Sequence, residues 1–247
     1  MNKIEKSPNT SAHADPGPLQ WSGARLPGHV NRSGRHALLR PLDAERDADS
    51  LWEAYAQDRE GQGWTWLPYG PFKAFAAFRE WLYGLPDTDP MFLSVSAPTL
   101  AGDAAIGLAS FLRIEPAHGV IEIGHIHFSP RLQQSTAATE ALFLMMRAAF
   151  EDWGYRRLEW KCDSRNAPSR RAAERLGFCF EGLFRQHLVV KGRNRDTAWY
   201  SIIDGEWPAV KAAIEAWLAP ENFDRQGRQR RSLSQLRHAL QGDGEQL

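Results

Sequence analysis

Residues 119–151 read GVIEIGHIHFSPRLQQSTAATEALFLMMRAAFE. The pattern over 120–128 is typical of a strand that a Ser-Pro pair ends, and a polar turn at 131–136 follows it. An apolar-periodic helix is then predicted from Ala137. A helix that begins at a strand end points its first backbone amides into the cleft there, which forms an anion-binding site. Because Glu122 lies in the same strand, the stretch predicts a phosphate-binding turn beside a proton acceptor.

Composition places the chain among ordinary globular proteins, with 247 residues, 43% of them hydrophobic and 24% charged. Thirty basic and thirty acidic residues cancel, so we expect neither nucleic acid nor an anionic membrane as a partner. Two cysteines, Cys162 and Cys179, favour a reducing compartment over a disulfide scaffold. The N-terminal stretch lacks an apolar signal segment, and no apolar run approaches membrane-spanning length. A cytoplasmic location is therefore expected.

The chain divides by composition into three parts. Residues 1–33 are rich in Pro, Ser and Gly and are predicted to form a flexible tail, 34–218 form a domain, and 219–247 form a polar C-terminal extension with a weak helix. Strands are predicted at 36–40, 92–95, 105–113, 120–128, 157–162, 180–191 and 196–204, and helices at 44–58, 72–83, 137–153, 169–176 and 207–218. This order predicts an α+β fold with a mixed, mostly antiparallel central sheet.

A second polar segment, Asn166-Ala167-Pro168-Ser169, follows the strand at 157–162. Taken structurally, Asn166 or Ser169 caps a helix that Gly177 closes. Taken functionally, the two side chains form a polar pair beside the turn at 131–136, provided that the two strands are neighbours. Spacing alone favours the capping interpretation, just as it leaves the turn at 131–136 open to being a plain strand-to-helix connection.

Together the two segments resemble the GNAT superfamily of acyl-CoA-dependent N-acetyltransferases, over roughly residues 36–205. The RimJ/RimL branch, which includes acetyltransferases of ribosomal-protein N-termini, is the most similar. The resemblance is carried by IEIGHIHFSP, the ATEAL opening of the next helix, NAPSRRAAERLGF with FEG, and the closing hairpin KGRNRDTAWYS. It implies an α/β/α sandwich whose central sheet splays at the cofactor site, and acetyl-CoA as the cosubstrate.

The resemblance also implies roles for single residues. Residues 133–138 match the pyrophosphate turn Q/R-x-x-G-x-G/A, except that Thr136 stands where the pattern has its glycine. Glu122 matches a general base, Asn166 a contact to the cofactor's amide arm, and Ser169 an acid towards the leaving thiolate. Backbone amides at 126–128 would polarise the thioester carbonyl. The implied cofactor-binding set is Ile126, His127, Phe128, Gln133, Gln134, Ser135, Thr136, Ala137, Ala138, Asn166 and Ser169.

The acyl acceptor is predicted to be an amine, either a protein N-terminus or a small amino compound. The aromatic loop at 64–72 is the candidate acceptor wall, with Trp64, Trp66 and Tyr69 as substrate-binding residues, although core cover is an equal alternative. His125 is predicted to line the same cleft. Residues three apart in a regular strand face opposite sides, so His125 shares a face with Glu122 only if a bulge intervenes.

Other residues favour less specific interpretations. His125 and His127 lack a third ligand at suggestive spacing, so no metal is expected. Cys162 is predicted to be a buried strand cysteine rather than a nucleophile. Arg193, Arg195 and Asp196 are predicted to form a solvated hairpin with an internal ion pair.

Two functions are compatible with these residues. The first is an acetyl-CoA-dependent N-acetyltransferase that works by direct attack of the amine. The alternative is a non-catalytic acyl-CoA-binding or ribosome-associated protein, which Thr136 would support because glycine permits backbone geometry that threonine does not. The sheet edges and the C-terminal extension leave a homodimer open.

Overall fold

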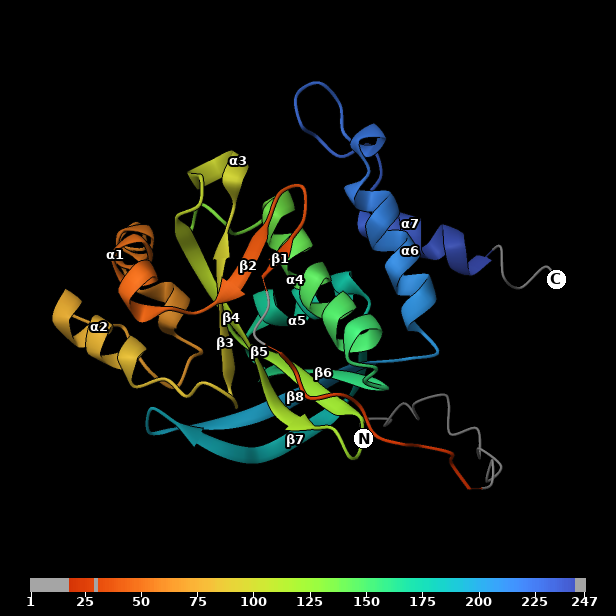
Figure 1. The fold of residues 1–247 in the computed structure, drawn as a ribbon, viewed down its shortest axis with the longest axis horizontal. Coiled ribbons are helices and arrows are strands. Elements are labelled where there is room, and N and C mark those ends of the chain that lie inside the picture. Colours follow the sequence, from red (N-terminus) through yellow and green to blue (C-terminus); the bar gives the residue numbers. More distant parts are fainter. Residues whose placement is uncertain (1–17, 29–30, 243–247) are drawn as a thin grey trace, which may run out of the picture.

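The computed structural model describes residues 18–28 and 31–242. One eight-stranded sheet runs through it in the order β1-β2-β3-β4-β5-β6-β8-β7 (Figure 1). Adjacent strands are antiparallel except β5 and β6, which are parallel. The strands are β1 (Arg32–Ser33), β2 (Leu38–Pro41), β3 (Met91–Ser96), β4 (Ala105–Glu115), β5 (Val120–Phe128), β6 (Arg157–Asp163), β7 (Cys179–Val190) and β8 (Arg193–Ile203). The predicted α+β fold with a mixed, mostly antiparallel sheet is confirmed.

Helices cover the two faces of the sheet unequally (Figure 1). One core packs α4, α5 and α6 against one face, and a smaller aromatic core packs α1 and α2 against the other face beside β4. The smaller core holds Tyr55, Trp64 and Phe78. The helices are α1 (Ala44–Tyr55), α2 (Phe75–Tyr83), α3 (Pro98–Ala101), α4 (Thr136–Arg147), α5 (Ala167–Leu176), α6 (Trp207–Leu218) and α7 (Leu233–Gly242). Within the described residues, none of these is both long and apolar enough to cross a bilayer.

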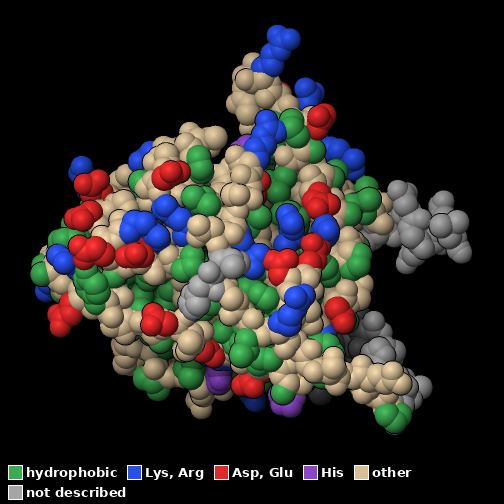
Figure 2. Space-filling model, viewed as in Figure 1, with side chains coloured by type: hydrophobic (Ala, Val, Ile, Leu, Met, Phe, Trp, Pro, Cys, Tyr) green, Lys and Arg blue, Asp and Glu red, His purple; other side chains and the backbone are tan. Residues whose placement is uncertain are grey.

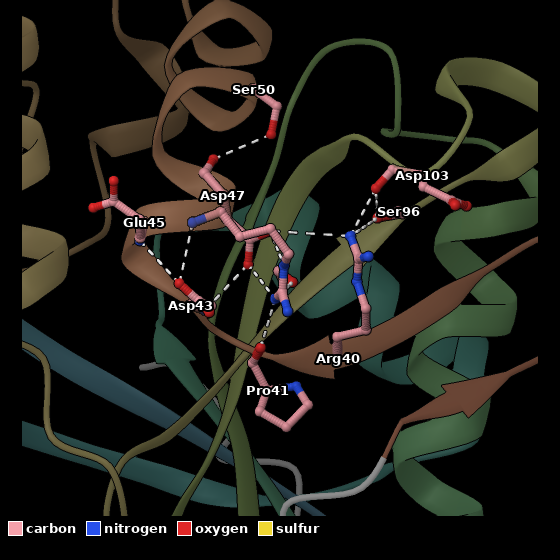
Figure 3. A network of polar contacts seen from close by, with 10 residues as sticks. Arg40, Pro41, Asp43, Glu45, Asp47, Ser50, Ser96 and Asp103 are labelled. Atoms are coloured by element: carbon pink, nitrogen blue, oxygen red, sulfur yellow. Dashed lines mark hydrogen bonds and ion pairs between the residues drawn. The ribbon is translucent and has the colours of Figure 1, made fainter.

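The start of α1 is fixed by a polar network (Figure 3). The side chain of Asp43 accepts hydrogen bonds from the backbone amides of Glu45 and Arg46, as predicted for an N-cap. Asp47 is only 1% exposed, and its carboxylate is bound by the Arg46 guanidinium at 2.6 and 2.7 Å. Arg40 of β2 lies 3.9 Å from the same carboxylate. The network therefore ties α1 to the sheet edge.

The central helix begins and ends differently from the prediction. It starts at Thr136 rather than Ala137, because Ser135 is its N-cap. After Arg147 the chain forms a π-helical turn, Ala148–Asp152, instead of continuing as α-helix to 153. The capping interpretation of the next helix is confirmed for Asn166, whose side chain accepts from the Ser169 amide at 3.1 Å.

The predicted N-terminal tail is partly held against the domain. Residues 1–17 and 29–30 lie outside the described residues, but Ala24 donates its amide to the Pro116 carbonyl and β1 pairs with β2. Just beyond, the buried Glu140 carboxylate of α4 accepts amides from three consecutive residues, Arg35, His36 and Ala37. Gly34 permits this approach, since a Cβ there would lie 2.3 Å from the Glu140 carboxyl carbon.

The C-terminal extension also contributes to the fold. Leu233 and Leu236 of α7 are buried in the larger core, although residues 243–247 lie outside the described part. On the face shown in Figure 2, basic and acidic side chains are interspersed rather than gathered by sign, in keeping with the zero net charge.

Candidate active site

The sheet opens between its two parallel strands. β5 pairs with β6 only over Val120–Glu122 and Arg157–Glu159, although β5 continues to Phe128 and β6 to Asp163. Beyond Glu122 the two strands therefore separate, which leaves their facing backbone groups free for another partner. This is the splay that the family resemblance implied, and Glu122 lies at its closed end.

A β-bulge lies on the open part of β5. Ser110 pairs with Gly124 and Leu108 with His127, so Ala109 alone faces both His125 and Ile126. His125 takes the left-handed conformation, with φ of +49°. The extra residue reverses the alternation of side chains. His125 consequently lies on the same face as Glu122, where it contacts Tyr69 and Phe92.

Glu122 is a buried carboxylate held by two cations. It is 3% exposed, and its Oε2 lies 2.7 Å from Arg113 Nη1 and 2.8 Å from Lys161 Nζ. Lys161 also contacts Glu159 at 2.5 Å and sits 3.9 Å above the Trp199 ring. Both cations use the same oxygen. The other oxygen, Oε1, lies near Gly124, where an added Cβ would be 3.5 Å from it.

Ser169 lies on the opposite face of the sheet from Glu122. Glu159 and Lys161 contact one another and Glu122, so the odd-numbered residues of β6 share the Glu122 face. Ser169 instead accepts a hydrogen bond from Trp160 Nε1 at 3.0 Å, on the face covered by α4 and α5. A group that passes through the opening between β5 and β6 can therefore meet Glu122 from one side and Ser169 from the other.

The turn before α4 presents unbonded amides. The Ser135 hydroxyl accepts from the Ala138 amide at 3.0 Å and donates to the Leu132 carbonyl at 2.6 Å. Among the described residues, the amides of Gln134, Thr136 and Ala137 have no protein acceptor. Three unbonded donors at a helix N-terminus fit an anionic group such as a pyrophosphate.

Thr136 does not distort this turn. The left-handed conformation falls two residues earlier, at Gln134, with φ of +56°. Thr136 is the first residue of α4 and has a helical backbone, which any L-residue adopts. The turn therefore needs no glycine at position 136, and the missing glycine does not argue against cofactor binding.

Replacing Ser135 with Ala is expected to lower the free energy of unfolding by about 0.5–2 kcal/mol, because the first turn of α4 loses its cap. The same change should weaken CoA binding, since the amides of Thr136 and Ala137 are no longer held in place. The matched control, Thr136→Gly, should leave the CoA dissociation constant within about twofold. Urea titration and calorimetry with CoA measure both quantities, and tighter binding by Thr136→Gly would contradict the geometry described for the turn.

The aromatic side chains of the loop at 64–72 differ in how far they are buried. Trp64 is 5% exposed and packs on Tyr55, Phe72 and His127, so it belongs to the smaller core and is not a free acceptor wall. His127 is 4% exposed, and its ring lies 3.9 Å from that of Tyr55. Phe78 and Trp81 of α2 pack on the indole, which favours the core-cover alternative for Trp64 over contact with a substrate.

Trp66 and Tyr69 of the same loop are less buried than Trp64. Trp66 is half-buried, and the Arg165 guanidinium carbon lies 5.7 Å from its ring. Lys191, at the turn between β7 and β8, donates to the Trp64 carbonyl at 2.8 Å. These two contacts join the loop to the far side of the splay, beyond β6.

The two histidines of β5 are neutral at neutral pH. Burial lowers the pKa of His125 to about 4, and the charges of Arg113 and Arg195 contribute to the lowering. Burial lowers the pKa of His127 to about 3, against the opposing effect of Asp58. His125 Nδ1 is hydrogen-bonded to the Tyr69 hydroxyl at 2.8 Å. Because its Nδ1 is engaged by the Tyr69 hydroxyl, His125 fits the role of hydrogen-bond partner better than that of auxiliary base.

Cys162 has the character of a structural cysteine. It is 5% exposed, and burial raises the pKa of its thiol. A thiol that resists ionisation is a poor nucleophile. The buried thiol therefore supports direct transfer over a covalent acyl intermediate.

Sequence reasoning missed the cations around Glu122. Arg113 reaches it from a bulge at the end of β4, where φ of Arg113 is +49°. Lys161 lies on the next strand, β6, between Trp160 and Cys162. This charged residue between two apolar ones was the one sequence signal for a cation beside Glu122. A charged residue in a strand of otherwise buried type is expected to have a buried partner.

Solved structures of acetyltransferases share this architecture. A GCN5-related N-acetyltransferase from Brucella melitensis superposes with a TM-score of 0.85 at 47% identity, covering 89% of this chain and 99% of that one. A probable acetyltransferase of the GNAT family from Chromobacterium violaceum superposes with a TM-score of 0.72 at 44% identity, covering 79% and 98%. The fold is thus that of an acetyltransferase.

The chain belongs to the GNAT family: the model of the acetyltransferase (GNAT) domain matches residues 36–179. A curated relative from Bacillus subtilis (strain 168), "Putative ribosomal N-acetyltransferase YdaF", is 28% identical over 185 residues, which are 74% of this chain and 97% of that protein. The protein is an acyl-CoA-dependent N-acetyltransferase, as the resemblance implied.

Proposed function

We propose that the chain transfers the acetyl group of acetyl-CoA to a free α-amine at a protein N-terminus. The observation that carries the proposal is Glu122, a buried carboxylate at the closed end of the splay whose Oε1 takes no part in its two ion pairs. The nucleophilic amine must be neutral. An α-amine has a pKa near 8 and a lysine near 10.4, so a neutral lysine costs about 3 kcal/mol more at pH 7.

The cofactor is proposed to enter from the face covered by α4 and α5. The unbonded amides of Gln134, Thr136 and Ala137 would hold its pyrophosphate, and the backbone at 126–128 on the free edge of β5 would bind the acyl arm. Gln133 supports this edge, because its side-chain amide donates to the Phe128 carbonyl at 2.8 Å. The side chain of His127 is committed to the aromatic core, so it would contribute through its backbone alone.

The chemistry then uses both faces of the sheet. The amine nitrogen forms a bond to the thioester carbon as the carbon–sulfur bond breaks. Glu122 takes the proton that the amine loses, directly or through water. Ser169, whose oxygen already accepts from Trp160, keeps its own proton for the departing thiolate.

The name of the Bacillus subtilis relative favours a ribosomal protein over a small amine as the acceptor. Lys191 and Arg165 both contact the aromatic loop. These contacts support an acceptor that enters the site as an extended chain end, because they restrict the space beside the loop. Trp66, Tyr69 and His125 are proposed to contact it.

A thiol-release assay with a peptide panel tests the proposal. Peptides with free N-termini should turn over, whereas N-terminally blocked peptides that contain lysine and simple alkylamines should not. Mass spectrometry should place the acetyl group on the α-nitrogen. Preferential turnover of blocked lysine peptides or of alkylamines would overturn the proposal.

A further inference from the structure

Arg195 lies on the same face of the sheet as Glu122. In β8, Trp199 pairs with Lys161 and Thr197 pairs with Asp163. Because every second side chain of a strand points to the same face, Arg195 also lies on the Glu122 face. The Nε of Arg195 donates to the Thr197 hydroxyl at 3.1 Å, which confirms the direction of its side chain. Arg195 is half-buried, contrary to the solvated hairpin expected from the sequence.

This guanidinium has no ionic partner, unlike the other cations of the site. Arg113 and Lys161 are bound to Glu122, and Arg165 is bound to Asp163 at 2.7 Å. Within the part of the chain that the structure describes, no carboxylate lies within 4 Å of Arg195. The expected ion pair with Asp196 does not form, because neighbouring residues in a strand point to opposite faces. Asp196 instead accepts from the Gln186 amide at 2.7 Å.

Arg195 interacts electrostatically with groups on both strands that border the opening, β5 and β6. It helps to lower the pKa of His125 on β5, and it is itself acted upon by Glu122 and by Asp163 at the end of β6. Burial lowers the pKa of Arg195, as expected for a cation removed from water without a counter-ion. Its two terminal nitrogens carry donors that no described residue uses, and a planar guanidinium of this kind binds a carboxylate with two parallel hydrogen bonds.

We propose that Arg195 binds a carboxylate of the acyl acceptor close to the reacting amine, so that the enzyme selects acidic acceptors. The inference rests on the proposed function and names the acceptor's chemical class. The carboxylate is either the side chain of an N-terminal Asp or Glu in a peptide, or the α-carboxylate of a free amino acid. Arg113 lies on the same face of the sheet, where Glu122 already binds it at 2.7 Å. The pyrophosphate of the cofactor has its own donors in the turn before α4, so it does not require Arg195.

The test compares kcat/KM for matched acceptors in the wild type, Arg195→Gln and Arg195→Lys. The acceptors are peptides that begin with Asp or Glu, the same peptides beginning with Asn or Gln, and free amino acids with their amides. The wild type should favour the acidic member of a pair by about 10- to 100-fold, the usual strength of a hydrogen bond to a charged group. Arg195→Gln should reduce this ratio to near one, and Arg195→Lys should retain part of it.

Two controls separate this inference from the proposed function. Arg193→Gln, which alters an exposed residue of the same hairpin, should leave the acidic preference intact. The KM for acetyl-CoA should be unchanged in all variants. An acidic preference that survives Arg195→Gln, or a raised KM for acetyl-CoA with no change in acceptor preference, would overturn the inference while α-amine transfer stands. Absence of α-amine turnover with every acceptor would overturn the proposed function itself. A preference for free amino acids over peptides would support the carboxylate subsite, with the α-carboxylate as its ligand, and would overturn the protein N-terminus as the proposed acceptor.

Discussion

Replacing Glu122 with Gln is expected to lower kcat/KM for acetyl transfer by about 10²- to 10⁴-fold, the range typical of a positioned general base. The amide keeps the size of the side chain but cannot accept the proton of the amine. Two cations remain in the site, Arg113 and Lys161, and they then lack their shared carboxylate. Steady-state rates measured with a peptide that the wild type acetylates give the size of the effect.

The loss should depend on pH. Below the amine's pKa, near 8, the acceptor must lose a proton, which Glu122 removes in the wild type. The variant relies on amine that is already neutral, a fraction that falls about tenfold per pH unit below that pKa. The deficit should therefore be largest near pH 6 and shrink towards pH 9. A variant whose pH profile matches that of the wild type would exclude Glu122 as the base.

Glu159→Gln is the matched control. Glu159 pairs with Glu122 across β5 and β6, shares Lys161, and is also bound by Arg157 at 2.7 Å. It belongs to the same charge network, but β6 places it one strand further from the bulge at His125. If Glu159→Gln reduced the rate as much as Glu122→Gln, the network as a whole rather than one carboxylate would carry the effect.

Trp64→Ala is expected to lower the free energy of unfolding by about 3–5 kcal/mol, the usual cost of removing a large buried aromatic side chain. Trp64 is 5% exposed, and its ring contacts those of Tyr55, Phe72, Trp81 and His127. Urea titration measures the change. The same loop offers its own control in Trp66, which is half-buried and contacts Arg165.

Trp66→Ala should cost about 1 kcal/mol or less, as for an exposed cation–π contact. It should instead raise the KM of the acceptor, because the contact with Arg165 helps to close the cleft. Equal losses of stability in the two variants would contradict the division of this loop into core and cleft.

Local features of the fold were predictable from local sequence. Asp43 and Asn166 precede their helices with the spacing of N-caps, and both caps are present. The strand, turn and helix at 119–151 were predictable because strand alternation, a Ser-Pro break and helical periodicity follow one another. The π-helical turn at Ala148–Asp152 left no comparable signal, since its residues continue the apolar pattern of the helix.

The site depended on relations between distant strands that the sequence does not display. The cations of Glu122 come from β4 and β6, and Arg113 reaches it only through a bulge. Whether Trp64 faced solvent or core depended on where α2 packs. The doubt over Thr136 arose from aligning a motif by position, whereas the left-handed residue of this turn is Gln134. The environment of Arg195 was partly predictable, because adjacent residues of a strand cannot share a face.

A crystal structure of the protein with CoA most directly tests whether the opening between β5 and β6 is the transfer site. We expect pyrophosphate oxygens within about 3 Å of the amides of Gln134, Thr136 and Ala137, in keeping with ordinary hydrogen-bond distances. The thiol should lie in the opening, with Ser169 on one side and Glu122 on the other. A cofactor bound elsewhere, or a thiol that does not enter the gap between the two strands, would contradict this assignment.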